Sequence, residues 1–556
     1  MLTHQSVVMA RCPRADQTEL RGSSASGVEN ERGRWMILAD RGGVGQKLSE
    51  EFVSRGQPCI LVSQGSTFER FSGDRLIIDP GRLEDFQQLF EEVRKTNDPP
   101  LRGVIHLFSL DAPLAEDTTL EELEDASTLG CRSALYLLQA LVAVKLPNAT
   151  RLWLVTKSAQ PVEDGGSALS VAQSPLWGLG RVIAMEHPEL WGGLLDLDRN
   201  DPGFEATSIL AEIREPDGED QIAFRGRGRY VARLRHSQVQ HAHGAPIRLP
   251  ADATYLITGG LGGMGLKLAR WLTERGARNL VLVARRSATS EAQEVVRDLE
   301  SLGARVVTAQ ADVSKEPDVA RILSMIRTSM PPLCGIIHAA GIFDDRVLVR
   351  HEWDRFARVL APKVSGGWNL HLHTKDLPLD FFVLFSSAAS FLGPVGLGNY
   401  TAANSFLDAL AYYRKSHGLP ALSIDWGPWK RVGMAEAVGE KRESQWSVGG
   451  FGTMHAEHAM DLMGQLMQED LAQVGVLPVE WSKFMERFGS GQEPRLFSAL
   501  AREAKSRPGA ERDQAQPELI RRLEAALPRD RWDTLVSYIH DLSIKVLGFD
   551  KSYALD

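Results

Sequence analysis

Short apolar runs alternate with amphipathic segments along most of the chain, and this alternation predicts β-strands separated by α-helices. In the second half the predicted strands are residues 255–258, 279–284, 305–310, 335–338, 381–386 and 421–425. They are rich in β-branched and aromatic residues, as is typical of parallel strands buried on both faces. Helical patterns lie between them, the clearest at 402–415. This order predicts an α/β fold with a doubly wound parallel sheet.

The first half of the chain repeats features of the second. Residues 101–106 and 333–338 share the pattern Leu-x-Gly-x-Ile-His at an offset of 232 residues. The first half begins with an apolar run at 35–39 and a helical pattern at 46–55, but it has no Gly-x-Gly-x-x-Gly there. Gln64 stands where a ribose or phosphate partner is expected. We interpret this half as a truncated Rossmann-like subdomain without a cofactor site, which braces the catalytic second half.

A glycine-rich stretch follows the first strand of the second half. Residues 255–265 read Tyr-Leu-Ile-Thr-Gly-Gly-Leu-Gly-Gly-Met-Gly. Gly260 permits a tight turn, Gly262 lets the backbone approach a pyrophosphate, and Gly265 lets the helix pack on the strand. The phosphates would lie at the positive N-terminus of the helix. The predicted dinucleotide contacts are Thr258, Gly260, Leu261, Gly262, Gly263, Met264 and Gly265.

The end of the second strand in this half indicates which dinucleotide binds. An NAD site would place Asp or Glu there, but this strand ends in Val-Ala-Arg-Arg-Ser. Arg285 and Arg286 suit the 2′-phosphate of NADPH, and no carboxylate is present to repel it, so NADPH is the favoured cofactor. The alternative is that the two arginines simply face solvent after the strand. Further predicted cofactor contacts are Asp312 and Val313 near the adenine, and Ala339, Ala340 and Gly341 near the ribose and nicotinamide.

A polar set of residues follows the strand at 381–386. Tyr400 and Asn404 are four residues apart, so both point to one face of a helix. Reduction of a carbonyl group needs a proton donor beside the oxygen that becomes anionic, and a tyrosine can supply it. A nearby ammonium would lower the tyrosine pKa from about 10, with Lys363 as the leading candidate, and Ser387 would be a second donor. Each residue alone could equally be a strand end, a helix cap or a surface lysine.

The spacing of these residues resembles that of the short-chain dehydrogenase/reductases, and within them the ketoreductase domains of modular polyketide synthases. Lys363, Ser387, Tyr400 and Asn404 match the family's Lys–Ser–Tyr–Asn tetrad in type, order and separation. Three other signatures match: Thr-Gly-Gly-x-Gly-x-x-Gly from 258, His-Ala-Ala-Gly from 338 and Asp-Trp-Gly-Pro from 425. The resemblance spans about residues 34–485, and its first part is similar to the family's catalytically empty structural subdomain.

The resemblance implies a substrate, a cofactor and partners. The substrate would be a β-ketoacyl chain held as a thioester on the phosphopantetheine arm of an acyl carrier protein, among the other domains of a polyketide synthase. NADPH would deliver hydride to the 3-keto carbon, Tyr400 would give the proton and Ser387 would orient the oxygen. Lys363 and Asn404 would organise the proton supply. Two alternatives stay open: a reductase of free ketones, and a redox-silent or epimerising domain of a synthase.

The resemblance also predicts the stereochemistry. B-type ketoreductases carry Leu-Asp-Asp after His-Ala-Ala-Gly, and Phe343, Asp344 and Asp345 occupy these positions here. A-type enzymes have tryptophan eight residues before the tyrosine, where this chain has Leu392. These residues favour a B-type enzyme giving a D-configured β-hydroxyl group, with a merely solvated acidic loop as the alternative. Ala402 stands where epimerising members tend to have proline, which favours reduction without α-epimerisation.

Composition and charge exclude several other functions. The 556 residues carry a net charge of -9 and no Lys/Arg-rich block, so no nucleic-acid partner is expected. No run of about 18 apolar residues predicts a membrane span, and no signal peptide is evident. The four cysteines are scattered without metal-binding spacing and are typical of reduced thiols. We expect a cytoplasmic protein without a metal site.

Changes in composition divide the chain into segments. We expect a linker at 1–33, the structural subdomain at 34–245, the catalytic subdomain at 246–488, a second linker at 489–520 and the start of a carrier-protein-like helix at 521–556. A helical pattern at 532–547 supports the last segment. Arginines alternate with apolar residues at 221–234, which predicts a hairpin with its arginines facing solvent.

Overall fold

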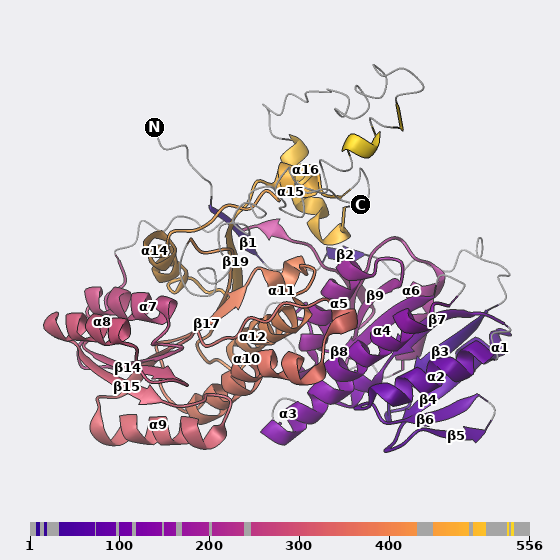
Figure 1. Ribbon diagram of the computed structural model, residues 1–556, viewed down its shortest axis with the longest axis horizontal. Coiled ribbons are helices and arrows are strands. Elements are labelled where there is room, and N and C mark those ends of the chain that lie inside the picture. Colours follow the sequence, from indigo (N-terminus) through magenta and orange to yellow (C-terminus); the bar gives the residue numbers. More distant parts are fainter. Residues whose placement is uncertain are drawn as a thin grey trace.

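Two α/β units lie side by side in the computed structural model, each built around one sheet (Figure 1). Helices α5 (Pro175–Glu186), α10 (Trp353–Thr374) and α12 (Gly398–Ser416) lie between the two sheets. The structure describes residues 7–11, 16–18, 33–72, 74–95, 99–113, 118–146, 150–162, 169–199, 203–237, 246–430, 449–488, 493–506, 531–532 and 535–538.

The second half forms the predicted doubly wound sheet, with parallel strands in the order β15-β14-β13-β16-β17-β18-β19. Their bounds are β13 (Thr254–Thr258), β14 (Asn279–Ala284), β15 (Arg305–Gln310), β16 (Leu333–His338), β17 (Phe381–Ser387), β18 (Leu422–Trp426) and β19 (Gln473–Pro478). The helices include α7 (Gly263–Glu274), α8 (Ser290–Ser301), α9 (Glu316–Ser329) and α14 (Ala456–Leu466). The central strands are buried on both faces, as their continuous apolar runs require.

The first half repeats this topology, with parallel strands in the order β6-β4-β3-β7-β8-β9-β10. Their bounds are β3 (Arg34–Leu38), β4 (Cys59–Gln64), β6 (Arg75–Ile78), β7 (Leu101–His106), β8 (Arg151–Lys157), β9 (Trp191–Leu197) and β10 (Gln221–Arg225). Helices α1 (Val44–Ser54), α2 (Leu83–Lys95), α4 (Ser133–Val144) and α6 (Glu205–Arg214) join them. This sheet also gains the antiparallel strands β2 (Asp16–Thr18), β5 (Glu69–Ser72) and β11 (Gly228–Val231), so within the described residues it is not truncated as predicted.

The N-terminal segment corrects one prediction, because residues 1–33 are not simply a linker. Strand β1 (Val7–Arg11) pairs antiparallel with β19 and with β12 (Arg235–His236) in the second sheet. Strand β2 (Asp16–Thr18) pairs with β11 in the first sheet. This short stretch therefore contributes a strand to each half.

The predicted linker at 489–520 is also partly structured. Helix α16 (Ser498–Ser506) follows a short turn, and Leu496, Phe497 and Leu500 are buried against Trp481 of α15 (Trp481–Met485). Of the expected carrier-like helix, residues 531–532 and 535–538 are helical, and the remainder lies outside the described residues.

The halves are joined through a helical interface. Helix α5 packs on α12, and a Cβ at Gly178 would lie 2.6 Å from the Thr401 carbonyl oxygen, so the helices touch backbone to backbone. Within the described chain, one helical run, Leu120–Val144, is long and apolar enough to cross a membrane by length and composition alone. It includes α4, whose apolar side chains belong to the main core, and 56% of its most apolar window is buried inside the protein.

Two arginines of the β10–β11 hairpin, Arg225 and Arg229, do not face solvent as predicted, whereas Arg227 at its turn is exposed. Arg225 forms a 2.6 Å ion pair with Asp196, which is fully buried, and Arg229 pairs with Glu212 at 2.5 Å. A buried charge needs a partner, because removing it from water without one is costly. These arginines therefore fix the edge of the first sheet instead of binding a ligand.

Candidate active site

The glycine-rich turn joins β13 to α7. Gly259 has a φ of +70°, and a Cβ there would lie 2.9 Å from the Ala339 carbonyl oxygen, so only glycine suits this position. The sharp turn is thus made by Gly259, one residue before the predicted Gly260. A Cβ at Gly265 would clash with the Gly259 carbonyl oxygen, which explains its role in helix packing. Gly262 precedes the helix without a side-chain cap, which leaves its first N–H groups for an anionic group.

Thr258 anchors the loop after β16 beside this turn. Its Oγ1 lies 2.7 Å from His338 Nδ1 and accepts a hydrogen bond from the Ala340 N–H at 3.3 Å. The Ala339 N–H donates to the Thr258 carbonyl oxygen at 3.2 Å. Burial lowers the pKa of His338 to about 3, so its ring is neutral at physiological pH. The structure therefore places Ala339, Ala340 and the following Gly341 next to the glycine turn.

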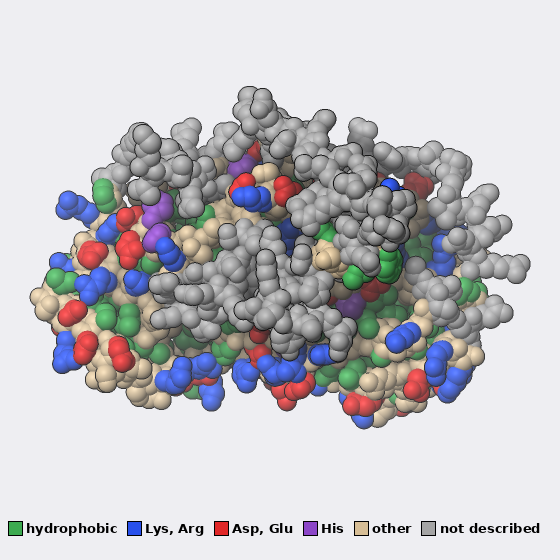
Figure 2. Space-filling view, turned by 45° about the horizontal axis from the view of Figure 1, so that its top comes forward, with side chains coloured by type: hydrophobic (Ala, Val, Ile, Leu, Met, Phe, Trp, Pro, Cys, Tyr) green, Lys and Arg blue, Asp and Glu red, His purple; other side chains and the backbone are tan. Residues whose placement is uncertain are grey.

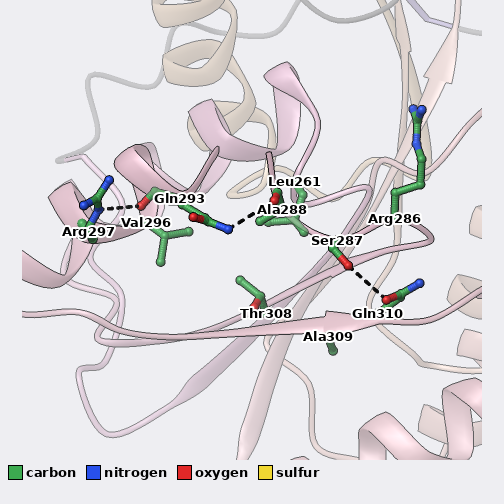
Figure 3. Close-up of a pocket in the computed structure, with 10 residues that line it drawn as sticks. All are labelled: Leu261, Arg286, Ser287, Ala288, Gln293, Val296, Arg297, Thr308, Ala309 and Gln310. Carbon is green, nitrogen blue, oxygen red and sulfur yellow. Dashed lines mark hydrogen bonds between the residues drawn. The ribbon is translucent and has the colours of Figure 1, made fainter. Parts of the chain in front are cut away.

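A cavity of about 590 Å³ lies between the turn and the ends of β14 and β15 (Figure 3). Leu261, Arg286 and Thr308 are among its lining residues. Ser287 donates to Gln310 at 3.2 Å, which fixes one wall (Figure 3). The volume of this cavity is within the range of small-molecule binding sites. The predicted residues Gly263 and Met264 form the first turn of α7 beside it.

A second cavity, of about 460 Å³, adjoins the first at Gln310 and is lined by Arg285 and Asp312. The two arginines thus face neighbouring cavities, and in Figure 3 the Arg286 side chain extends away from the other labelled side chains. Asp312 accepts from the Ser314 N–H and hydroxyl, and the Val313 carbonyl oxygen accepts from Asn369. A glycine cradle, uncapped N–H groups and two guanidinium groups together fit a phosphorylated dinucleotide.

Tyr400 lies in the first turn of α12 and is 9% exposed. Its N–H donates to Asn399 Oδ1 at 2.7 Å, and Asn399 Nδ2 donates to the Asp344 carbonyl oxygen at 3.0 Å. Burial raises the pKa of Tyr400 from its ordinary value, while hydrogen bonds with the side chains of Ser387 and Asn404 oppose the rise. The expected lowering of the Tyr400 pKa by Lys363 is therefore outweighed by burial, and the phenol is protonated at neutral pH.

The other three predicted catalytic residues surround this phenol. Lys363 reaches from α10, its Nζ lies 5.8 Å from the centre of the Tyr400 ring, and it donates to the Phe385 carbonyl oxygen at 2.6 Å. Burial lowers the pKa of Lys363 to about 8. Ser387 ends β17, and Asn404 Nδ2 donates to the Tyr400 carbonyl oxygen at 2.7 Å. The structure thus brings all four residues together.

Two buried carboxyl groups near Lys363 were not assigned to the site from the sequence, although Asp425 begins the Asp-Trp-Gly-Pro signature. Asp408 accepts from Ser423 at 2.7 Å, and Asp425 accepts from Gln473 at 2.7 Å. Burial raises the pKa of both carboxyls, and the nearby Asp408 raises that of Asp425 further. Both acids counteract the lowering of the Lys363 pKa. The signal was available, because Asp408 lies four residues after Asn404 on the same helix face.

The residues predicted to control stereochemistry occupy two different places. The Phe343 ring meets the Tyr400 ring edge-on at 5.5 Å between centres. Asp344 is held by Arg355 at 2.9 Å and by Arg358 at 2.8 Å, which keep its pKa below the usual range. Asp345, by contrast, is exposed. Leu392 ends α11 (Ala389–Leu392) and packs against the cluster around Trp481 and Phe484.

The corresponding turn in the first half is filled by the chain itself. Asp40 accepts from the Gly45 N–H at 2.7 Å and the Val44 N–H at 3.2 Å, at the start of α1. A carboxylate therefore sits where a phosphate would bind in the second half. Gln64 donates to Asp111 at 2.6 Å, so it too is engaged internally. These contacts agree with a subdomain that has no cofactor site.

The face drawn in Figure 2 carries charged side chains of both signs. Figure 2 shows acidic and basic side chains intermixed over the described part of this face. Among the described residues, no group of three His, Cys, Asp or Glu side chains could hold a metal ion.

Each half of the chain matches a known protein family. The family described as "KR domain" matches residues 253–431, and "Polyketide synthase extender module SpnB, Rossmann fold domain" matches residues 62–234. Polyketide synthase GfsA of Streptomyces halstedii is 34% identical over 491 residues, which cover 85% of this chain and 6% of that protein. The chain thus spans only a small part of this curated relative.

Two solved structures match over nearly their whole length. The first ketoreductase of the tylosin PKS is 31% identical, with a TM-score of 0.73 and coverage of 90% of this chain and 100% of that chain. The structure of an A1-type ketoreductase is 29% identical, with a TM-score of 0.77 and coverage of 91% of this chain and 99% of that chain. The B-type assignment is not confirmed by these matches and stays a prediction.

Fold and site together define an oxidoreductase of the short-chain dehydrogenase/reductase class, which uses NAD(P)H. The chain belongs to the ketoreductase domains of modular polyketide synthases. The general reaction of such domains is reduction of a β-keto group.

Proposed function

We propose that this domain uses NADPH to reduce the 3-keto group of a β-ketoacyl chain, held as a thioester on the phosphopantetheine arm of an acyl carrier protein. It would act in the cytoplasm, among the other domains of a polyketide synthase. The observation that carries this proposal is the convergence of Tyr400, Ser387, Lys363 and Asn404 on one buried cluster. The cluster lies at the carboxyl end of the parallel sheet, where α/β folds bind their ligands.

The residues of the chain divide the work of this reaction. NADPH, when bound, supplies the hydride. Tyr400 donates its phenolic proton as negative charge develops on the substrate oxygen, and Ser387 is a second donor to that oxygen. Lys363 is cationic below about pH 8 and stabilises the phenolate that remains. Asn404, anchored on the Tyr400 backbone, holds the helix turn that presents the phenol.

The preference for NADPH is tested with the double variant Arg285→Ala, Arg286→Ala. Because a hydrogen bond to a charged group contributes about 1.5–3 kcal/mol, the double variant should weaken NADPH binding roughly tenfold or more. The binding of both cofactors is measured by quenching of tryptophan fluorescence. NADH binding should change by less than about twofold, since NADH has no 2′-phosphate. Arg305→Ala, at the opposite end of β15, is the control. Equal losses for both cofactors would remove the 2′-phosphate assignment of Arg285 and Arg286.

B-type stereocontrol is a second part of the proposal. Three features support it: the acidic pair Asp344 and Asp345, the leucine at 392 in place of tryptophan, and the direct contact of Phe343 with Tyr400. Phe343 stands where B-type relatives have leucine, so the wall beside the phenol is larger here. Ala402 supports reduction without epimerisation at the α-carbon.

The product configuration is expected to be D at the β-hydroxyl. The domain is given NADPH and a racemic 2-methyl-3-ketoacyl thioester, and the products are separated on a chiral column. A D-configured main product supports both the reductase and the B-type assignment, while an L-configured one keeps the reductase and refutes B-type. Absence of turnover despite NADPH binding would favour the redox-silent alternative. Equal turnover of simple ketones without a thioester would favour a reductase of free ketones.

A further inference from the structure

Glu186 is the last residue of α5, in the half that has no cofactor site, yet its carboxylate bonds two loops of the other half. Oε2 accepts from the Leu348 N–H at 2.7 Å, and Oε1 accepts from the Gly396 N–H at 2.7 Å. Each oxygen thus accepts one N–H, and each N–H comes from a different loop. A carboxylate is the side chain that can accept on both oxygens at once.

Both bonded loops lead to Tyr400, one through Phe343 and the other through the start of α12. The first loop continues from Phe343, whose ring contacts the Tyr400 ring, and from Asp344, whose carbonyl oxygen holds Asn399. The second loop runs directly into α12, with Gly396 at a φ of +81° and Tyr400 four residues later. Any change in the separation of these loops would therefore act on the space in front of the phenol.

The loops are also bonded to each other, and they present apolar side chains to solvent. The Arg346 N–H donates to the Gly396 carbonyl oxygen at 2.8 Å. Val347 and Val349 on the first loop are 38% and 36% exposed, and Val395 on the second is 55% exposed. Exposed valines on two adjoining loops beside a catalytic phenol form an edge along which an acyl chain can lie.

Other residues of the first half hold the same region. Gln139 of α4 donates to the carbonyl oxygens of Leu348 and His351, both at 2.8 Å. Arg181 of α5 donates to the Ser390 carbonyl oxygen at 2.8 Å. Glu186 differs from these two because it alone of the three bonds both loops, and it acts together with the direct Arg346–Gly396 hydrogen bond to hold them at one distance.

We propose that Glu186 is a positioning residue that determines which face of the β-keto group meets the hydride, by fixing the separation of the loops around Leu348 and Gly396. This inference rests on the proposed ketoreductase function and deepens it. It assigns part of the specificity to the half of the chain that lacks a cofactor site. A residue that only joined the two halves would affect stability and leave the product configuration unchanged.

The experiment compares Glu186→Gln and Glu186→Ala with the unmodified domain. The matched control is Glu189→Gln, three residues further on, whose side chain is 64% exposed and forms an ion pair with His187. Hydrogen–deuterium exchange is read at the Leu348 and Gly396 amides, and needs no catalytic activity. Kinetics and the ratio of product stereoisomers are then measured with NADPH and the racemic thioester.

Loss of a charge-assisted hydrogen bond should speed exchange at both amides by about tenfold in Glu186→Ala, with Glu186→Gln affecting one amide more than the other. KM should rise by roughly three- to tenfold while kcat changes by less than about twofold, because the proton donor is untouched. The stereoisomer ratio should fall by about fivefold or more, as a loosened loop misplaces the substrate. The control Glu189→Gln should match the unmodified domain in amide exchange, in kinetics and in the stereoisomer ratio.

Two outcomes would overturn the inference about Glu186 and leave the proposed ketoreductase function standing. One is unchanged exchange at both amides, and the other is faster exchange with an unchanged stereoisomer ratio. Failure of the proposed function is distinguishable, because the unmodified domain would then reduce nothing, and the inference would fall with it. A variant with normal NADPH binding and a lowered ratio supports the inference even if its melting temperature falls slightly.

Discussion

Tyr400→Phe is expected to lower kcat by about 10²–10⁴-fold, the contribution that general acid catalysis makes, while NADPH binding is retained. The substitution keeps the ring, so the edge-on contact with Phe343 and the packing of α12 are preserved. It removes only the hydroxyl that would protonate the substrate oxygen. Turnover is followed by NADPH absorbance, and binding by quenching of tryptophan fluorescence.

The control for this prediction lies on the same helix. Tyr413 is also buried, at 4% exposed, but packs against His371 and His417 at the far end of α12. Tyr413→Phe makes the same chemical change and should leave kcat within about twofold, because this ring is remote from the proton-donor cluster. Tyr400→Phe activity within a few-fold of normal would refute the assignment of Tyr400 as proton donor.

Lys363→Met is expected to lower kcat by about 10²-fold and to change the pH profile. Burial lowers the pKa of Lys363 to about 8, so the ammonium is present below pH 8 and is lost as the pH rises through that value. Reduction leaves a phenolate that this cation stabilises. The unmodified domain should therefore lose activity above about pH 8, and the variant should lack that step.

The pH profile separates this role from a structural one. Lys375→Met, at the exposed C-terminal end of α10, should keep both the rate and the step near pH 8. Persistence of the step in Lys363→Met would assign the titration to another group and refute this role. Because Lys363 is buried next to Asp408 and Asp425, the melting temperature is measured alongside, so that unfolding is not taken for lost catalysis.

Much of the fold could be predicted because its signals are local. Parallel strands buried on both faces need continuous apolar runs, and the runs from β13 to β18 were placed to within about two residues. The polar cluster could be predicted because Tyr400 and Asn404 share a helix face. The turn was misplaced by one residue, since consecutive glycines give no sign of which one takes the positive φ that Gly259 adopts.

What the sequence did not predict depends on contacts between distant residues. Strands β1 and β2 lie in a segment whose composition is typical of a linker, and only pairing with β19 and β11 makes them strands. The ion pair between Arg225 and Asp196 reverses the expected exposure of that arginine. The bonds from Glu186 to two loops join positions 162 and 210 residues apart, which no local pattern reveals.

The placement of β1 and β12 at the edge of the second sheet has a practical consequence. Both strands come from outside residues 246–488, so a fragment cut at those bounds would leave one side of β19 without a partner. A bare edge exposes a row of unsatisfied N–H and C=O groups that recruits other chains. The two halves are therefore interlocked rather than joined end to end, and neither can be excised cleanly by a single cut between them.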